Sequence, residues 1–148
     1  MAEEKNKSDK ILVVEDDEAS STIIVRLLNQ MGFSKIIQAE NGSIALSKLY
    51  LNEVSIIISD WRMPDTDGLE FYKRAKKEGL LNDIPFLMVS AENERGRVAE
   101  ALKAGVNDYI LKPVDLKILS QKIEKLLSLQ ARSRTTESTK DNNSCYCL

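Results

Sequence analysis

Short runs of apolar, mostly β-branched residues recur along the chain, and segments with apolar residues three or four positions apart lie between them. Such runs predict buried strands, and the three-to-four spacing predicts amphipathic helices. The expected strands are Lys10–Val14, Ser34–Ala39, Val54–Ile58, Ile84–Val89 and Val106–Leu111. The expected helices are one between Asp17 and Gly32, then Ser43–Leu51, Leu69–Lys77, Arg95–Ala104 and Asp115–Leu129. This alternation predicts an α/β fold, a doubly wound five-stranded parallel sheet with helices on both faces.

Each expected helix has an apolar stripe that should face the sheet. The stripes contain Ile24 and Leu28 in the first helix, Ala101 and Leu102 in the fourth, and Leu116, Leu119 and Ile123 in the last. An acidic residue precedes the first and the last helix, where a side-chain oxygen can accept a hydrogen bond from the first turn. We therefore expect Asp17 and Asp115 to be N-caps.

Composition sets limits on the function. The chain has 148 residues, the usual length of one domain, and a formal net charge of −2. It contains no histidine, which excludes histidine-based catalysis and histidine metal ligands. Both cysteines, Cys145 and Cys147, lie at the C-terminus, so the core needs no disulfide and suits a reducing compartment. With no signal peptide and no apolar run of membrane-spanning length, we expect a cytoplasmic protein that binds no membrane.

Polar residues follow the expected strands at their carboxyl ends. Glu15 and Asp16 follow the first strand, Asp60 the third, Ser90 the fourth and Lys112 the fifth. Parallel strands bring these ends to one edge of the sheet, where open α/β sheets bind their ligands. Carboxylate oxygens suit Mg²⁺, and the hydroxyl and ammonium groups can hold phosphate oxygens. The pattern predicts a phosphoryl-transfer site with Asp60 as the candidate nucleophile.

Several of these residues also have a plainer interpretation. Asp60 could cap the end of its strand, and Ser90 could cap the turn that follows it. Trp61 could belong to a partner-binding surface, although a half-exposed tryptophan next to any site is common. Tyr109 could simply pack on the sheet with its hydroxyl group in water. Three charged residues of the fourth helix, Arg95, Arg97 and Lys103, are typical of a solvated helix face.

Four separate motifs occur in order along the chain. They are Ile11-Leu12-Val13-Val14-Glu15-Asp16, Asp60-Trp61-Arg62-Met63-Pro64-Asp65-Thr66-Asp67-Gly68, Val89-Ser90-Ala91 and Tyr109-Ile110-Leu111-Lys112-Pro113. From Asp16, the successive spacings to Asp60, Ser90 and Lys112 are 44, 30 and 22 residues. In these motifs and spacings, residues 10–129 resemble the receiver domain of two-component response regulators, especially single-domain CheY-like regulators. The resemblance implies the flavodoxin-like strand order 2-1-3-4-5.

The resemblance also implies a phosphorylation site and a metal site. Asp60 is similar to the phosphoacceptor that receives a phosphoryl group from a sensor histidine kinase. The expected cofactor is Mg²⁺, with Asp16 as the direct ligand, Glu15 acting through water, and Asp60 as a further member of the metal site. The backbone carbonyl of Arg62 resembles the remaining protein ligand, which leaves the side chain at this position free to vary.

The remaining motif residues resemble a switch. Ser90 and Lys112 are similar to the pair that grips the phosphoryl group, and Tyr109 is similar to the aromatic residue that changes position. The Lys112–Pro113 bond resembles the cis peptide that aims the lysine. The implied output surface consists of residues 95–104, 106–111 and 115–129. It would bind a downstream protein, with a phosphatase as a further partner of an otherwise monomeric protein.

The motifs depart from the family pattern in two places. Ser90 stands where threonine is commoner, and its hydroxyl group preserves the chemistry. Arg62 is large and cationic at a position that borders the path of the attacking water. With Glu92 it could form a salt bridge across the mouth of the site, which would alter the lifetime of the phosphoryl group.

The two ends of the chain differ in composition from its middle. Residues 1–9 and 130–148 are polar, so we expect a disordered N-terminus and a flexible tail around a receiver domain at residues 10–129. The tail is too short for an output domain, and the absence of a helix-turn-helix segment and a basic patch argues against nucleic-acid binding. The last four residues formally fit a prenylation box, but no polybasic run precedes them, which favours free thiols.

Three classes of function fit this pattern. We favour a stand-alone response regulator, in chemotaxis-type or other two-component signalling, that is no enzyme beyond its own phosphorylation and dephosphorylation. A phosphorelay intermediate that passes phosphate to a histidine phosphotransfer protein would use the same residues, so sequence does not separate the two. A phosphohydrolase of the haloacid-dehalogenase type needs an acid two residues after its nucleophile, where this chain has Arg62.

Overall fold

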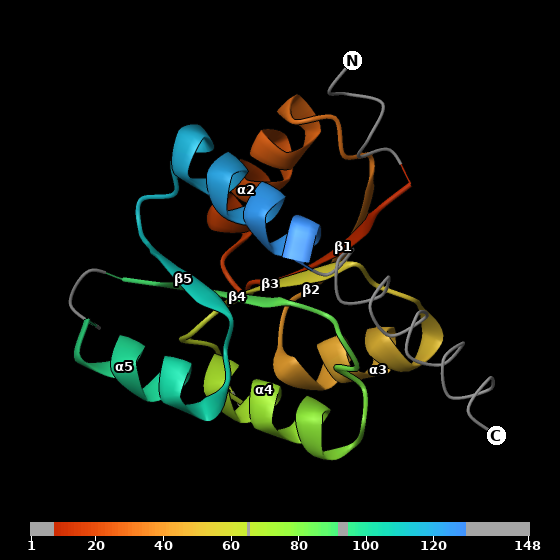
Figure 1. Ribbon diagram of the computed structural model, residues 1–148, viewed down its shortest axis with the longest axis vertical. Helices are drawn as coiled ribbons and strands as arrows, with labels where there is room; N and C mark the ends of the chain where they lie inside the picture. The colour runs from red at the N-terminus through yellow and green to blue at the C-terminus, as the bar shows by residue number, and fades with distance from the viewer. Residues whose placement is uncertain (1–7, 65, 92–94, 130–148) are drawn as a thin grey trace, which may run out of the picture.

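The computed structural model describes residues 8–64, 66–91 and 95–129, without the side chain of Arg95 (Figure 1). Its strands are β1 (Lys10–Val14), β2 (Lys35–Ala39), β3 (Ile56–Asp60), β4 (Phe86–Ser90) and β5 (Asp108–Leu111). Its helices are α2 (Glu18–Gln30), α3 (Gly42–Leu51), α4 (Gly68–Lys77), α5 (Arg95–Ala104) and a last helix at residues 116–129. All strand pairs are parallel in the order β2-β1-β3-β4-β5, which confirms the expected fold class and strand order.

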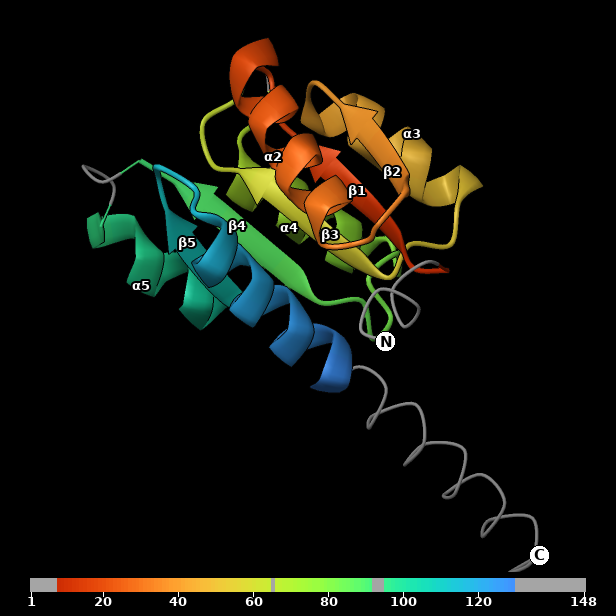
Figure 2. The ribbon, with the colours of Figure 1, turned by 90° about the horizontal axis from the view of Figure 1, so that it is seen from above.

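Helices cover both faces of the sheet and make a three-layered molecule (Figures 1 and 2). On one face, α3, α4 and α5 bury a cluster that includes Leu12, Ile57, Met88, Ala45, Leu69 and Ala101. On the other, α2 and the last helix bury a cluster that includes Ile11, Ile58, Val89, Leu28, Leu119 and Ile123. Strands β1, β3 and β4 are buried on both faces, which explains why their sequences are continuous apolar runs.

Side-chain caps begin the helices close to the predicted positions. Asp17 accepts a hydrogen bond from the backbone N–H of Ser20 at 2.9 Å, and Asp115 accepts one from Ile118 at 3.2 Å. Both predicted N-caps are therefore confirmed. Asn41 and Asp67 cap α3 and α4 in the same way. These caps satisfy N–H groups that have no partner within the helix.

Three burial predictions were wrong. Leu102 and Leu116 were expected to face the sheet, but they are 41% and 39% exposed. The sheet-facing positions of the same helices are taken by Ala101 and Leu119, which are fully buried. Trp61 was expected to be half-exposed and is 2% exposed, because its ring belongs to the buried cluster under α4 and α5. Within the described residues, no helix has the length and apolarity needed to cross a membrane.

Candidate functional site

The carboxyl ends of four strands bring the predicted site residues together. Additional ladder hydrogen bonds continue past three of these ends and hold the backbone there. They run from Glu15 N to Ala39 O at 3.0 Å, from Trp61 N to Val89 O at 2.9 Å, and from Lys112 N to Ser90 O at 2.7 Å. The sheet therefore fixes the backbone at three of the four strand ends that carry the site.

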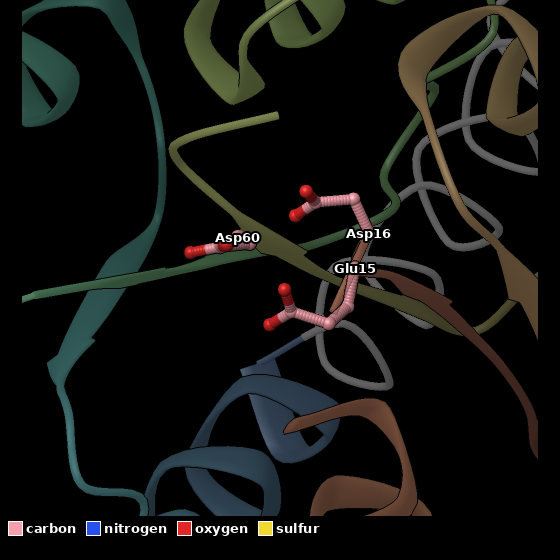
Figure 3. A group of neighbouring side chains, drawn as sticks. All are labelled: Glu15, Asp16 and Asp60. Carbon is pink, nitrogen blue, oxygen red and sulfur yellow. The ribbon is translucent and has the colours of Figure 1, made fainter. Parts of the chain in front are cut away.

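Three carboxylates form the acidic part of the site (Figure 3). Glu15, Asp16 and Asp60 each offer one oxygen atom, and these three atoms lie within 4.8 Å of one another. Glu15 and Asp60 are 4% and 7% exposed, whereas Asp16 is exposed to solvent. Oxygen donors at this spacing fit a hard divalent cation such as Mg²⁺, which keeps several waters and takes one or two carboxylates.

One ammonium group faces these carboxylates. Lys112 places its Nζ atom 3.2 Å from Oε1 of Glu15 and 3.4 Å from Oδ1 of Asp60. Oδ1 of Asp60 also accepts a hydrogen bond from the backbone N–H of Trp61 at 2.9 Å. The Lys112–Pro113 peptide bond is cis, as the resemblance implied. Asp60 is therefore held in one orientation by two donors on the same oxygen.

Burial and like charge shift the protonation equilibria of the site. Burial, and then the charge and hydrogen bond of Asp60, raise the pKa of Glu15 to about 7. Burial also raises the pKa of Asp60, although Glu15 and Lys112 act in the opposite direction. Burial opposes charge on Lys112, but the nearby Asp60 and Glu15 outweigh it and raise the pKa of Lys112. Ionised carboxylates are thus crowded here, and a cation would relieve the crowding.

Ser90 supplies a buried hydroxyl group beside this cluster. It ends β4, next to the strand that carries Asp60, and it is 1% exposed. Within the described part of the chain, its Oγ atom has no hydrogen-bond partner. A buried hydroxyl without a partner is costly and uncommon, and it is available to an incoming acceptor.

The turn after Asp60 approaches the site closely at Gly68. The N–H of Gly68 donates a hydrogen bond to the carbonyl of Trp61 at 2.7 Å. A Cβ atom at this position would collide with the backbone carbonyl oxygen of Asp60. Steric space therefore requires glycine at the first residue of α4, which lies against the backbone of Asp60 and Trp61.

The sequence did not reveal that Arg97 reaches the site. Its guanidinium carbon lies 5.8 Å from the centre of the Trp61 ring, a distance typical of cation–π contacts. Together with Asp16 and Arg62, the two side chains line a pocket at the mouth of the acidic cluster. From the sequence, Arg97 was predicted to lie on the solvated face of its helix. The packing of α5 against the turn after β3 instead brings its side chain to the mouth of the acidic cluster. The expected partner of Arg62, Glu92, lies outside the described residues.

Tyr109 lies on β5, away from the carboxylates. It is half-buried and lines a pocket with Val98, Leu102 and Leu111 on the α5 side of the sheet. It is paired in register with Met88, two residues before Ser90 on the same face of β4. Such diagonal neighbours are within reach of an aromatic side chain. A route of side-chain contact from Ser90 to Tyr109 is therefore sterically available.

Comparison with known proteins gives a consistent result. Residues 11–124 match the response regulator receiver domain family. The chain is 40% identical over 119 residues to a chemotaxis protein CheY homolog of Campylobacter jejuni, covering 80% of this chain and 92% of that protein. It is 37% identical to chemotaxis protein CheY1 of Helicobacter pylori, covering 80% and 96%. The receiver domain of Francisella response regulator 1452 has a similar structure, with a TM-score of 0.74, 28% identity, and coverage of 82% and 98%. The chain belongs to the response regulator receiver domain family.

Proposed function

We propose that this protein is a stand-alone response regulator whose Asp60 accepts a phosphoryl group from a sensor histidine kinase. The observation that carries the proposal is the site itself. A buried carboxylate stands among two further acids, an ammonium group at 3.4 Å and a buried hydroxyl without a partner among the described residues. No simple capping role for Asp60 accounts for this set of neighbours.

The proposed reaction transfers a phosphoryl group from a histidine nitrogen of the kinase to a carboxylate oxygen of Asp60. A carboxylate oxygen of Asp60 attacks the phosphorus atom of a phosphohistidine, the P–N bond breaks, and the imidazole leaves with the electron pair. When bound, Mg²⁺ neutralises negative charge on phosphoryl oxygens. Glu15, Asp16, Asp60 and the backbone carbonyl of Arg62 would hold it. Lys112 is near enough to stabilise charge on the phosphoryl group and on the acyl oxygen.

The proposed output begins at Ser90. The phosphoryl group adds about −1.5 to −2 charges at neutral pH and three acceptor oxygens. The Ser90 hydroxyl, which has no hydrogen-bond partner among the described residues, can donate to one of them, and its movement would leave space toward which Tyr109 can turn. That turn changes the surface made by α5, β5 and the last helix, which we propose binds the downstream protein.

The proposed setting is two-component signalling of the chemotaxis type, in the cytoplasm. The names of the two curated relatives support chemotaxis, and the family match over residues 11–124 supports the receiver domain expected at residues 10–129. Phosphorelay transfer to a histidine phosphotransfer protein uses the same site chemistry and is the alternative outcome of the test.

The test is capture of binding partners with and without an activated site. Purified protein is presented to a lysate from its source in Mg²⁺, with or without beryllofluoride, and captured proteins are identified by mass spectrometry. A partner retained only with beryllofluoride, and not by Asp60→Asn, supports a switched surface. Rapid return of phosphate from phosphorylated protein to a histidine phosphotransfer domain would instead favour the relay. Identical captures under all conditions would contradict the proposal.

A further inference from the structure

A second group of charged and aromatic side chains lies on the edge strand β5. Lys122, on the last helix, places its Nζ atom 2.8 Å from Oδ1 of Asp108. The same Asp108 oxygen accepts a hydrogen bond from the backbone N–H of Tyr109 at 2.8 Å. Nζ of Lys122 also lies 5.2 Å from the centre of the Tyr109 ring. One lysine–aspartate pair therefore contacts both the backbone and the ring of Tyr109.

The position of β5 at the edge of the sheet makes this contact possible. Asp108 and Ile110 point to the face covered by the last helix, whereas Tyr109 points to the α5 side. Because β5 is the edge strand of the described sheet, the long side chain of Lys122 can reach across the edge and touch groups on both faces.

The Lys122–Asp108 pair is partly shielded from solvent. The side chains of Lys122 and Asp108 are 29% and 13% exposed. Solvent screens such a pair less than a fully exposed one, so it holds its geometry more firmly. The ammonium group over Tyr109 is attracted to the face of the ring.

We propose that Lys122 and Asp108 form a latch that holds Tyr109 in its resting position. This inference rests on the proposed function, since it assigns a control to the Tyr109 switch. The ring can turn toward the space beside Ser90 only by leaving the Lys122 ammonium. Lys122 is thus a positioning residue that sets how easily phosphorylation activates the output surface, without touching the phosphoryl group.

A purely structural ion pair and a latch predict different results. A structural pair that only protects the strand edge would change the melting temperature and leave the switch equilibrium alone. A latch stabilises one of two ring positions, so its loss raises the fraction of activated protein. Losing a cation–π contact of ordinary strength should change that fraction roughly two- to fivefold.

The experiment follows Tyr109 directly by fluorine NMR of the full chain labelled with 3-fluorotyrosine. The chain has four tyrosines, and Tyr109→Phe identifies the resonance. Beryllofluoride is titrated in the presence of Mg²⁺, and the concentration at half-conversion is measured. Lys122→Met should lower this midpoint roughly two- to fivefold, because the active state starts from a larger population. Lys122→Arg, which keeps the cation, should restore the wild-type midpoint.

Two further variants make the result specific. Lys125→Met removes an exposed charge from the same helix and should leave the midpoint unchanged. Asp108→Asn keeps an oxygen for the Tyr109 N–H and removes the charge that holds Lys122. It should lower the midpoint like Lys122→Met, and the double variant should add little.

Two outcomes would overturn the inference, and they are distinguishable. In the first, the Tyr109 resonance responds to beryllofluoride with equal midpoints in wild type and Lys122→Met. This result would disprove the latch and leave the proposed switch intact. In the second, the Tyr109 resonance of the wild type does not change when beryllofluoride is added. This result would disprove both the proposed switch and the latch.

Discussion

The ammonium group of Lys112 lies 3.2 Å from a carboxylate oxygen of Glu15, a residue 97 positions earlier in the chain. Lys112 therefore contacts two of the three acidic side chains at the end of the sheet, Glu15 and Asp60. Burial of Glu15, and then the nearby charge and hydrogen bond of Asp60, raise the pKa of Glu15, and this shift leads to the first two predictions.

Without Mg²⁺, the free energy of unfolding should fall as pH rises from about 4.5 to 7. The pKa of Glu15 is raised in the folded state from 4.5 to about 7, so in this range the folded state binds more protons than the unfolded state. Stability then decreases with pH, by at most about 1.4 kcal/mol per pH unit for one group. Chemical denaturation at several pH values measures this. Glu15→Gln should flatten the profile, and an equal slope in both proteins would contradict the assignment.

Mg²⁺ should stabilise the folded protein at neutral pH through the same carboxylates. At ten times its Kd, a ligand that binds only the folded state adds about 1.4 kcal/mol. Asp16→Ala should abolish the Mg²⁺-dependent rise in Tm, measured by thermal unfolding. Glu40→Ala, which removes an exposed acid from the neighbouring cleft, should keep it. A full Mg²⁺ effect in Asp16→Ala would remove Asp16 from the proposed metal site.

Asp60 should be the single site of phosphorylation by acetyl phosphate and Mg²⁺. Intact-mass measurement should show one added phosphoryl group that hydroxylamine removes, as expected of an acyl phosphate. Asp60→Asn should lose this group. Asp67→Asn is the matched control, because asparagine also caps helices well and α4 should remain in place. A phosphoryl group found on a serine or threonine would argue against an aspartyl phosphate.

Ser90→Ala should separate phosphorylation from its output. The Ser90 hydroxyl is buried and has no partner among the described residues, so its removal should not lower the free energy of unfolding. Phosphorylation of Asp60 should remain largely intact. Amide exchange over residues 95–129 should lose its response to beryllofluoride. The same response in wild type and variant would show that the switch does not pass through Ser90.

Gly68→Ala should damage both stability and phosphorylation. The added methyl group meets the carbonyl oxygen of Asp60, and overpacking of this kind typically costs about 1–3 kcal/mol. Because the collision displaces the backbone of Asp60, the rate of phosphorylation by acetyl phosphate should also fall. Gly96→Ala is the control, since a Cβ atom there meets nothing within 4 Å and alanine favours the helix. Equal stability of both variants would disprove the close approach.

Much of the fold follows from local patterns. The apolar runs in β1, β3 and β4 predicted strands buried on both faces, and alternation with helices predicted a parallel sheet. Parallel sheets place all carboxyl ends at one edge, so the residues after these runs had to meet. This is why Glu15, Asp60, Ser90 and Lys112 could be predicted as one site without coordinates, while the strand order came from resemblance to a family.

Packing between distant elements decided the rest. Trp61 was expected to be half-exposed and Arg97 to lie on a solvated helix face, and the sequence pattern gave Lys122 no role. The structure instead buries Trp61, places Arg97 over its ring, and brings Lys122 across the sheet edge to Tyr109. The spacing of apolar residues along a helix or strand shows which of its faces is apolar, because this spacing depends only on residues that are near in sequence. Which long side chain reaches which ring depends on the angles and offsets between packed layers, and these arise only when the whole sheet and its helices assemble.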